Sequence, residues 1–135
     1  MKVSEIMSGN LATIGCNATL HDAAQVMASA DVGSLPVVDA GRLVGVVTDR
    51  DIVVRGLAKG HAVDAQVSGV MTADVLSVDF EDPVSTASEL MEKHQVRRIY
   101  VTRDSAPCGV VSLGDVAKNV PAPDSGEALR NISKS

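Results

Sequence analysis

The residues best suited to chemistry in this chain form a hydroxyl-and-carboxylate motif that occurs twice. One copy runs from Gly45 to Asp51 (GVVTDRD) and the other from Gly109 to Asp115 (GVVSLGD). In both, an apolar run predicts a strand, and a hydroxyl residue three positions before Asp predicts a helix N-cap resembling a capping box. A carboxylate in a first helical turn could also accept both hydrogen bonds from a ribose diol, while the nearby backbone N–H groups face an anion. The motif is therefore a structural cap and also a candidate ligand site.

Arg97 and Arg98 are the only adjacent arginines in the chain, and they follow Val96 at the entry to a predicted strand. A solvated pair of charges is one interpretation. Guanidinium groups held on a rigid element can also clamp a phosphate with forked donors. The residues alone leave both interpretations open.

The two motifs belong to an internal repeat. They are 64 residues apart (109 − 45 = 64), and the same offset, without a gap, also aligns Val3 with Val67, Met7 with Met71 and Met27 with Met91. A tandem repeat of this kind usually means that one supersecondary unit buries its apolar face against its copy. Two copies favour a closed pseudo-twofold pair over a solenoid.

Each copy reads as a β-α-β-β-α unit of the α/β (α+β) class. Apolar residues at helical spacing predict a first helix around Leu20 to Met27 and around Val84 to Met91, with Pro83 in the first turn of the latter. Two short apolar runs joined by a turn predict a hairpin in each copy. The predicted strand, hairpin and second-helix segments are 11–14, 34–38, 43–47 and 49–57 in the first copy, and 75–78, 98–102, 108–111 and 114–119 in the second.

The predicted organisation is a first repeat over residues 1–60, a second over 61–120 and a flexible C-terminal tail over 121–135. Gly56 and Gly60 flank the passage into the second copy, so residues 57–66 are the expected linker. The tail is rich in Pro, Ser and Asp.

Composition disfavours several functions. The chain has 12 basic and 17 acidic residues, a formal charge of −5, with one Tyr and one Phe, so nucleic-acid binding is not expected. No apolar run approaches the roughly 20 residues that span a bilayer, and the first ten residues do not resemble a secretory signal, so a cytoplasmic protein without membrane association is expected.

Enzymatic and metal-binding motifs are also missing from the sequence. It has no P-loop, GxGxxG, GxSxG or HExxH motif, so no catalytic residue is assigned and the chain is not expected to be an enzyme. Cys16 and Cys108, with His21, His61 and His94, show no ligand-like spacing, so no metal site is predicted.

The doubled unit, with GVVTDRDI in the first copy and His94-Gln95-Val96-Arg97-Arg98-Ile99 in the second, resembles a CBS-domain pair, or Bateman module. The likeness covers about residues 1 to 120. It is strongest to the small stand-alone two-CBS proteins of bacteria, including the hypoxic response type. The resemblance implies a non-catalytic regulatory module, connected with stress response, whose clefts between the repeats bind an adenine nucleotide.

The resemblance also implies two ligand sets, each taking a hydroxyl and an Asp from one copy and other contacts from the other. The first set is Thr48, Arg50, Asp51, Ser77, Val78, Val96, Arg97 and Arg98. The second set is Thr13, Ile14, Val32, Gly33, Ser34, Ser112 and Asp115. Aliphatic side chains such as Val47, Val78 and Val96 would sandwich the adenine.

The first set, with three arginines, suits AMP, ADP, ATP or NAD, whereas S-adenosyl compounds carry their own positive charge and fit less well. The second set lacks matched phosphate partners and is expected to bind weakly, to hold an uncharged adenosine portion, or to stay empty. No obligatory cofactor is expected. The expected assembly is a homodimer with an unidentified regulated partner. The alternative is an interaction or dimerisation protein whose ligand clefts are degenerate.

Overall fold

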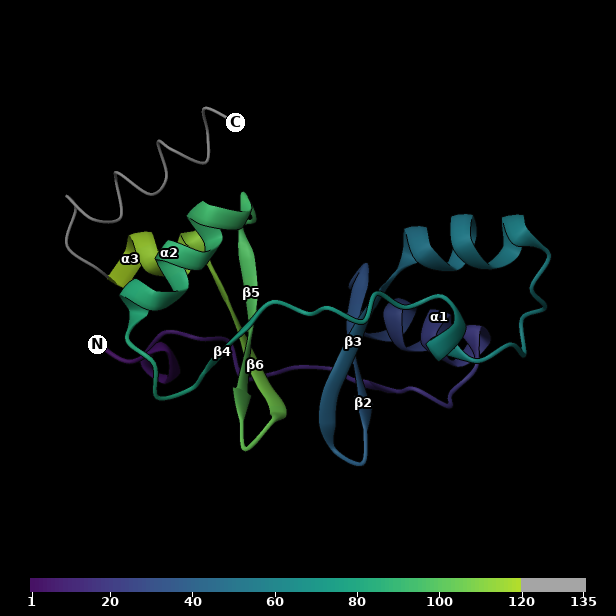
Figure 1. Ribbon diagram of the computed structural model, residues 1–135, viewed down its shortest axis with the longest axis horizontal. Helices are drawn as coiled ribbons and strands as arrows, with labels where there is room; N and C mark the ends of the chain where they lie inside the picture. The colour runs from purple at the N-terminus through teal and green to yellow at the C-terminus, as the bar shows by residue number, and fades with distance from the viewer. Residues whose placement is uncertain (120–135) are drawn as a thin grey trace. The chain divides into compact units, whose positions relative to one another are not determined.

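The computed structural model describes residues 1–119, which form two compact units (Figure 1). Within the described residues, unit 1 comprises Met1–Leu11, Leu76–Asp104 and residues 108–119, and unit 2 comprises Ala12–Val75 with Ser105–Pro107. Unit 1 therefore contains most of the second sequence repeat and unit 2 most of the first. The tail predicted over residues 121–135 lies outside the described residues.

Unit 2 is built on a sheet with the strand order β1-β2-β3, in which β1 runs parallel to β2 and β2 antiparallel to β3. The helix α1 and the helical segment after β3 lie on one side of this sheet (Figure 1). Its elements are β1 (Ile14–Gly15), α1 (Leu20–Ala30), β2 (Ser34–Asp39), β3 (Arg42–Thr48), η2 (Asp51–Gly56), η3 (Leu57–Lys59) and η4 (Val67–Gly69).

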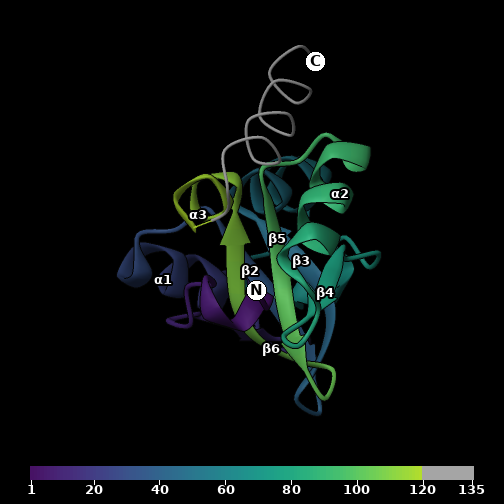
Figure 2. The same cartoon turned by 90° about the vertical axis from the view of Figure 1, so that its left-hand side faces the viewer.

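Unit 1 repeats the plan with the strand order β4-β5-β6, and β4 is parallel to β5. Figure 2 looks onto this unit and shows α2 and α3 on the near face of the sheet. Its elements are η1 (Val3–Glu5), β4 (Ser77–Asp79), α2 (Val84–His94), β5 (Arg98–Arg103), β6 (Ala106–Ser112) and α3 (Leu113–Asn119). The mixed α/β class predicted from the sequence is confirmed.

The two long helices form where the apolar spacing predicts them. In α1, Thr19 and Asp22 form a reciprocal capping box, and the helix buries Leu20, Ala23 and Met27. In α2 the buried positions are Val84, Ala87 and Met91. Each helix ends at a residue in the left-handed region, Asp31 or Gln95. In both helices the buried residues recur at helical spacing, so each helix packs with a single apolar face.

Both hairpins turn through two residues with positive φ. These are Ala40 (φ 51°) and Gly41 (φ 80°) between β2 and β3, and Asp104 (φ 51°) and Ser105 (φ 69°) between β5 and β6. Positive φ at both central positions is the signature of a type I′ turn, whose twist matches that of the flanking strands. The second hairpin makes this turn without glycine.

The cores show that each unit includes a short segment from the other sequence copy. Val3 and Ile6 are buried in the unit 1 core, and Val67 and Val70 are buried in the unit 2 core. The remaining residues of the unit 1 core are Val78, Val84, Ala87, Met91, Ile99, Val101, Val111, Leu113 and Val116. Those of the unit 2 core are Ile14, Leu20, Ala23, Met27, Leu35, Val37, Val47 and Ile52.

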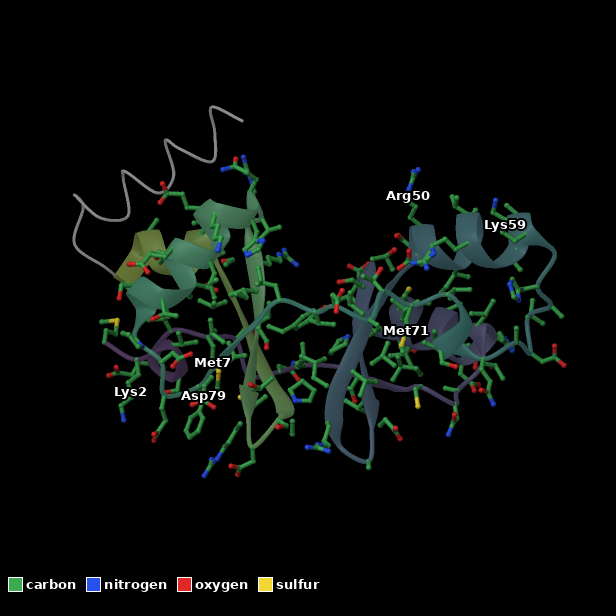
Figure 3. The ribbon with its side chains drawn as sticks, viewed as in Figure 1. Lys2, Met7, Arg50, Lys59, Met71 and Asp79 are labelled. Atoms are coloured by element: carbon green, nitrogen blue, oxygen red, sulfur yellow. The ribbon has the colours of Figure 1, made fainter. Side chains whose placement is uncertain are left out.

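These exchanged segments also pair with the sheets. Ser8 forms an antiparallel bridge with Val110, and Thr72 forms one with Val46. The approach is close because the neighbouring strand residue is glycine: a methyl group at Gly45 would lie 2.7 Å from Met71 Sδ. A methyl group at Gly109 would lie 2.7 Å from the Sδ of Met7, which is labelled with Met71 in Figure 3.

Three local predictions need correction. Pro83 is the N-cap of α2, with extended backbone (ψ 150°), and not a residue of its first turn. The strands β1 and β4 begin later than the extended segments predicted at 11–14 and 75–78. The second helix of the first copy, predicted over 49–57, is π-helical over Asp51–Gly56 and 3-10 over Leu57–Lys59, whereas its counterpart α3 is α-helical. Gly56, the last residue of η2, packs closely against α1, since a methyl group there would lie 3.0 Å from Leu20 Cδ1.

Candidate functional site

In unit 2 the predicted hydroxyl-and-carboxylate motif forms a corner between β3 and η2. The Thr48 N–H donates to Asp51 Oδ2 (2.9 Å), and the Asp51 N–H donates to Thr48 Oγ1 (3.0 Å). This is a capping box, so the structural interpretation of the motif is correct. The side chain of Asp51 is only 15% exposed. We call these residues, Thr48 to Asp51, the first corner.

Unit 1 builds the same corner between β6 and α3. The Ser112 N–H donates to Asp115 Oδ2 (2.9 Å), and the Asp115 N–H donates to Ser112 Oγ (3.1 Å). We call Ser112 to Asp115 the second corner. In both corners the cap uses Oδ2, so each carboxylate retains acceptor capacity for a further donor such as a sugar hydroxyl.

The strand end beside the first corner carries residues with small side chains, Gly33 and Ser34. The Asp49 N–H donates to the Gly33 carbonyl (2.9 Å), and Ser34 pairs with Thr48 across the sheet. A methyl group at Gly33 would lie 3.1 Å from Asp49 Oδ2. Asp49 Oδ1 accepts the Arg50 N–H (2.8 Å), while the Arg50 side chain projects outward from the start of η2 (Figure 3).

The strand end beside the second corner is cationic. The Leu113 N–H donates to the Arg97 carbonyl (3.0 Å), and Arg98 begins β5. Both arginines are exposed. Within residues 1–119, neither they nor Arg50 form an ion pair. Their charges are therefore available to an anion.

Arg55 contacts the first corner and was not among the site residues predicted from the sequence. Its Nη1 lies 3.7 Å from Asp51 Oδ1 and 3.3 Å from Thr72 Oγ1. The position four residues after Asp51 on a helix is a signal for such a pair. In the second copy the equivalent residue (119 − 64 = 55) is Asn119, whose amide donates to the main-chain carbonyl of Asp115 (2.7 Å).

The other predicted site residues lie on the strands and their approaches. Ser77 and Val78 are in β4, paired with Tyr100 and Val101, while Ile14 is in β1. Ile14 is 8% exposed and Val78 4% exposed, so both side chains belong to the cores. Thr13 and Val32 are exposed, and Val96 and Ser34 are half-buried.

Burial limits which of the three valines predicted to sandwich the adenine a ligand could reach. Val47 has no exposed surface and packs in the unit 2 core, so its side chain is not open to a ligand. Val78 is nearly as buried, which leaves the half-buried Val96 as the accessible member of the predicted trio.

The part of the chain that the structure describes offers no metal-binding cluster and no membrane-spanning helix. Among residues 1–119 there is no group of three or more His, Cys, Asp or Glu side chains that could hold one metal ion. None of the helices described there is long and apolar enough to cross a membrane.

Comparison with known proteins gives matches along nearly the whole chain. The CBS domain family model matches twice, at residues 3–57 and 67–122. The CBS domain-containing protein YhcV of Bacillus subtilis is 39% identical over 132 residues, which is 97% of this chain and 94% of that protein. Hypoxic response protein 1 of Mycobacterium tuberculosis is 37% identical over 119 residues, covering 87% of this chain and 83% of that protein.

Solved structures agree with the sequence matches. The crystal structure of hypoxic response protein I, with two coordinated zinc ions, has a TM-score of 0.76 at 35% identity and covers 90% of this chain and 100% of that one. The CBS domain pair of protein MJ0100, in complex with 5′-methylthioadenosine and S-adenosyl-L-methionine, has a TM-score of 0.69 at 27% identity, with 87% of this chain and 94% of that chain covered.

Proposed function

Because the chain belongs to the CBS-domain family and is a CBS pair of the regulatory class, we propose that it is a non-catalytic sensor of an adenine nucleotide. Two corners of the same chemistry, one in each unit, carry this proposal. Each presents a carboxylate whose Oδ2 is held by a backbone N–H at 2.9 Å. A carboxylate fixed in this way can accept hydrogen bonds from a ribose diol without first being ordered, which lowers the entropic cost of binding.

The first proposed ligand set combines Thr48, Arg50 and Asp51 of the first copy with residues of the second copy. Arg50, Arg97 and Arg98 would neutralise the phosphates, since all three are exposed and unpaired within residues 1–119. The remaining members are Ser77, Val78 and Val96. Val78 would contribute its main chain, because its side chain is 4% exposed.

The second proposed set is Thr13, Ile14, Val32, Gly33, Ser34, Ser112 and Asp115. It contains no arginine, so we expect it to bind a nucleotide weakly or to hold an uncharged adenosine portion. The methylthioadenosine and S-adenosyl-methionine bound by MJ0100 support the adenosine class of ligand. The three arginines of the first set favour AMP, ADP, ATP or NAD over a cationic S-adenosyl compound.

The wider assignment includes a cytoplasmic homodimer that responds to cellular stress through a partner protein. Unit 2 supports self-association because it exposes apolar side chains on and after η2, with Val53 57%, Leu57 47% and Val63 59% exposed. The hypoxic response relative supports the connection with stress. The same exposed residues favour the second candidate function, a dimerisation protein with degenerate ligand corners.

Isothermal titration of AMP, ATP, NAD and S-adenosylmethionine tests the proposal. We expect the wild type to bind at least one nucleotide, and Asp51→Ala or the double variant Arg97→Ala/Arg98→Ala to lose most of that binding. Asp64→Ala and Arg42→Ala remove the same kinds of charge at exposed positions outside the proposed sets and should bind as the wild type does.

Two results would contradict the proposal. Absence of heat with all four ligands would transfer the assignment to the dimerisation protein, for which light scattering should show a dimer that Leu57→Ser weakens. Equal losses in the site and control variants would show that net charge, and not the first corner, governs binding.

A further inference from the structure

Arg55 connects the first corner to the segment that follows η4. Its Nη1 is 3.7 Å from Asp51 Oδ1 and 3.3 Å from Thr72 Oγ1. The side chain of Asp51 is 15% exposed and that of Arg55 is 50% exposed, so the contact lies at the edge of solvent. The cap thus holds the Asp51 carboxylate at Oδ2, and Oδ1 faces Arg55 in an ion pair that is too long to be a hydrogen bond.

The ion pair with Arg55 favours one orientation of the carboxylate plane. A carboxylate held only at Oδ2 can still rotate about the Cβ–Cγ bond, because this terminal torsion has a broad energy profile. The Arg55 guanidinium donates to Thr72 Oγ1, and from that position it attracts Asp51 Oδ1 electrostatically. Thr72 is itself anchored, since its N–H and carbonyl exchange two hydrogen bonds with Val46 (2.9 Å each). Arg55 therefore ties Asp51 to the edge of the sheet.

The second corner lacks this brace. Asn119 stands in the place of Arg55, and its amide bonds to the main-chain carbonyl of Asp115. Within residues 1–119, the carboxylate of Asp115 forms no ion pair. The two corners share their caps and differ in whether a cation faces the second carboxylate oxygen.

We propose that Arg55 is a positioning residue that orients the Asp51 carboxylate for the ribose diol, so that the first corner discriminates ribose from deoxyribose more strongly than the second. This inference rests on the proposed nucleotide binding at Asp51. Arg55 acts through Asp51 and does not itself contact the ligand. Discrimination follows because a correctly oriented carboxylate can accept both hydroxyl groups of a ribose, whereas 2′-deoxyribose offers only one of them.

The test compares titrations of AMP and 2′-deoxy-AMP into the wild type, Arg55→Met, Arg55→Lys and Lys59→Met. Lys59 is an exposed cation of the same helical stretch, so Lys59→Met removes equal charge away from Asp51 (Figure 3). Because the ion pair between Arg55 and Asp51 is partly exposed and therefore weak, we expect Arg55→Met to lower the affinity for AMP by up to about fivefold. Affinity for 2′-deoxy-AMP should change less than about twofold, Arg55→Lys should lie between, and Lys59→Met should match the wild type.

Equal weakening of AMP and 2′-deoxy-AMP by Arg55→Met would overturn the proposal in favour of a charge effect or a phosphate contact. An unchanged AMP affinity would also overturn it. If the wild type binds no nucleotide, the proposed function fails, and crystal structures of the free wild type and Arg55→Met decide the positioning role separately. We expect the Asp51 carboxylate plane to turn or to become disordered in Arg55→Met while that of Asp115 stays as in the wild type. An unchanged Asp51 carboxylate would refute the role of Arg55.

Discussion

Replacing Gly45 by Ala should destabilise unit 2 because the exchanged segment leaves no room for a side chain. The added methyl group would lie 2.7 Å from Met71 Sδ and 2.9 Å from the carbonyl oxygen of Thr72. The sulfur can move, but the carbonyl accepts the Val46 N–H at 2.9 Å and cannot retreat without stretching that bond. Overpacking costs about 1–3 kcal/mol and a weakened hydrogen bond about 1 kcal/mol, against a gain of about 0.5–1 kcal/mol from replacing a strand glycine. The net expectation is that Gly45→Ala lowers the free energy of unfolding by about 2 kcal/mol.

Urea denaturation followed by circular dichroism measures this loss, and Gly69→Ala is the matched control. Gly69 belongs to the same segment, yet a methyl group there meets nothing within 4 Å. The control should change the free energy of unfolding by less than about 0.5 kcal/mol. If Gly45→Ala matched the control, the close approach of the segment would be refuted.

Three further predictions concern the hairpins, a helix cap and a thiol. Because Ser105 has φ 69° and Gly41 has φ 80° at equivalent turn positions, Ser105→Gly should raise and Gly41→Ser should lower the free energy of unfolding, each by about 1 kcal/mol, in the same urea assay. Hydrogen bonds from Thr19 hold the pKa of Asp22 below its ordinary value of 3.8, so its stabilising effect is present above that value and is lost as pH falls through the lower folded pKa. Asp22→Asn should therefore be less stable than wild type at neutral pH, with a gap that closes in acid; a constant gap would contradict this. Burial raises the pKa of the Cys108 thiol, so mass spectrometry should show slower alkylation by iodoacetamide at neutral pH than for free cysteine, and faster alkylation would contradict it.

The elements were predictable because local patterns determine them. Apolar spacing predicted α1 and α2, and the turn residues predicted both hairpins. The corners were also predictable, since a hydroxyl residue three positions before Asp caps a helix from whichever strand precedes it. These features depend on residues within a few positions of one another.

The exchange of segments could not be predicted, because the two copies carry identical or similar residues at the positions involved. Val3 matches Val67 and Met7 matches Met71, while Ile6 corresponds to Val70, so the residue types do not show which core each segment joins. The role of Arg55 was hidden for the same reason. Its contact with Thr72 exists only because residues 67–72 pack with the first copy.

The exchanged segments also determine what a protease could separate. A single nick in the stretch 57–66 would cut the backbone between the two sequence copies. Each compact unit would then contain segments from both fragments, because Val3 and Ile6 are buried in one core and Val67 and Val70 in the other. The fragments would remain bound by these buried aliphatic side chains and by the bridges at Ser8 and Thr72. The nicked chain should therefore behave as a complementing pair of peptides, held together like a complex although it was made as one polypeptide.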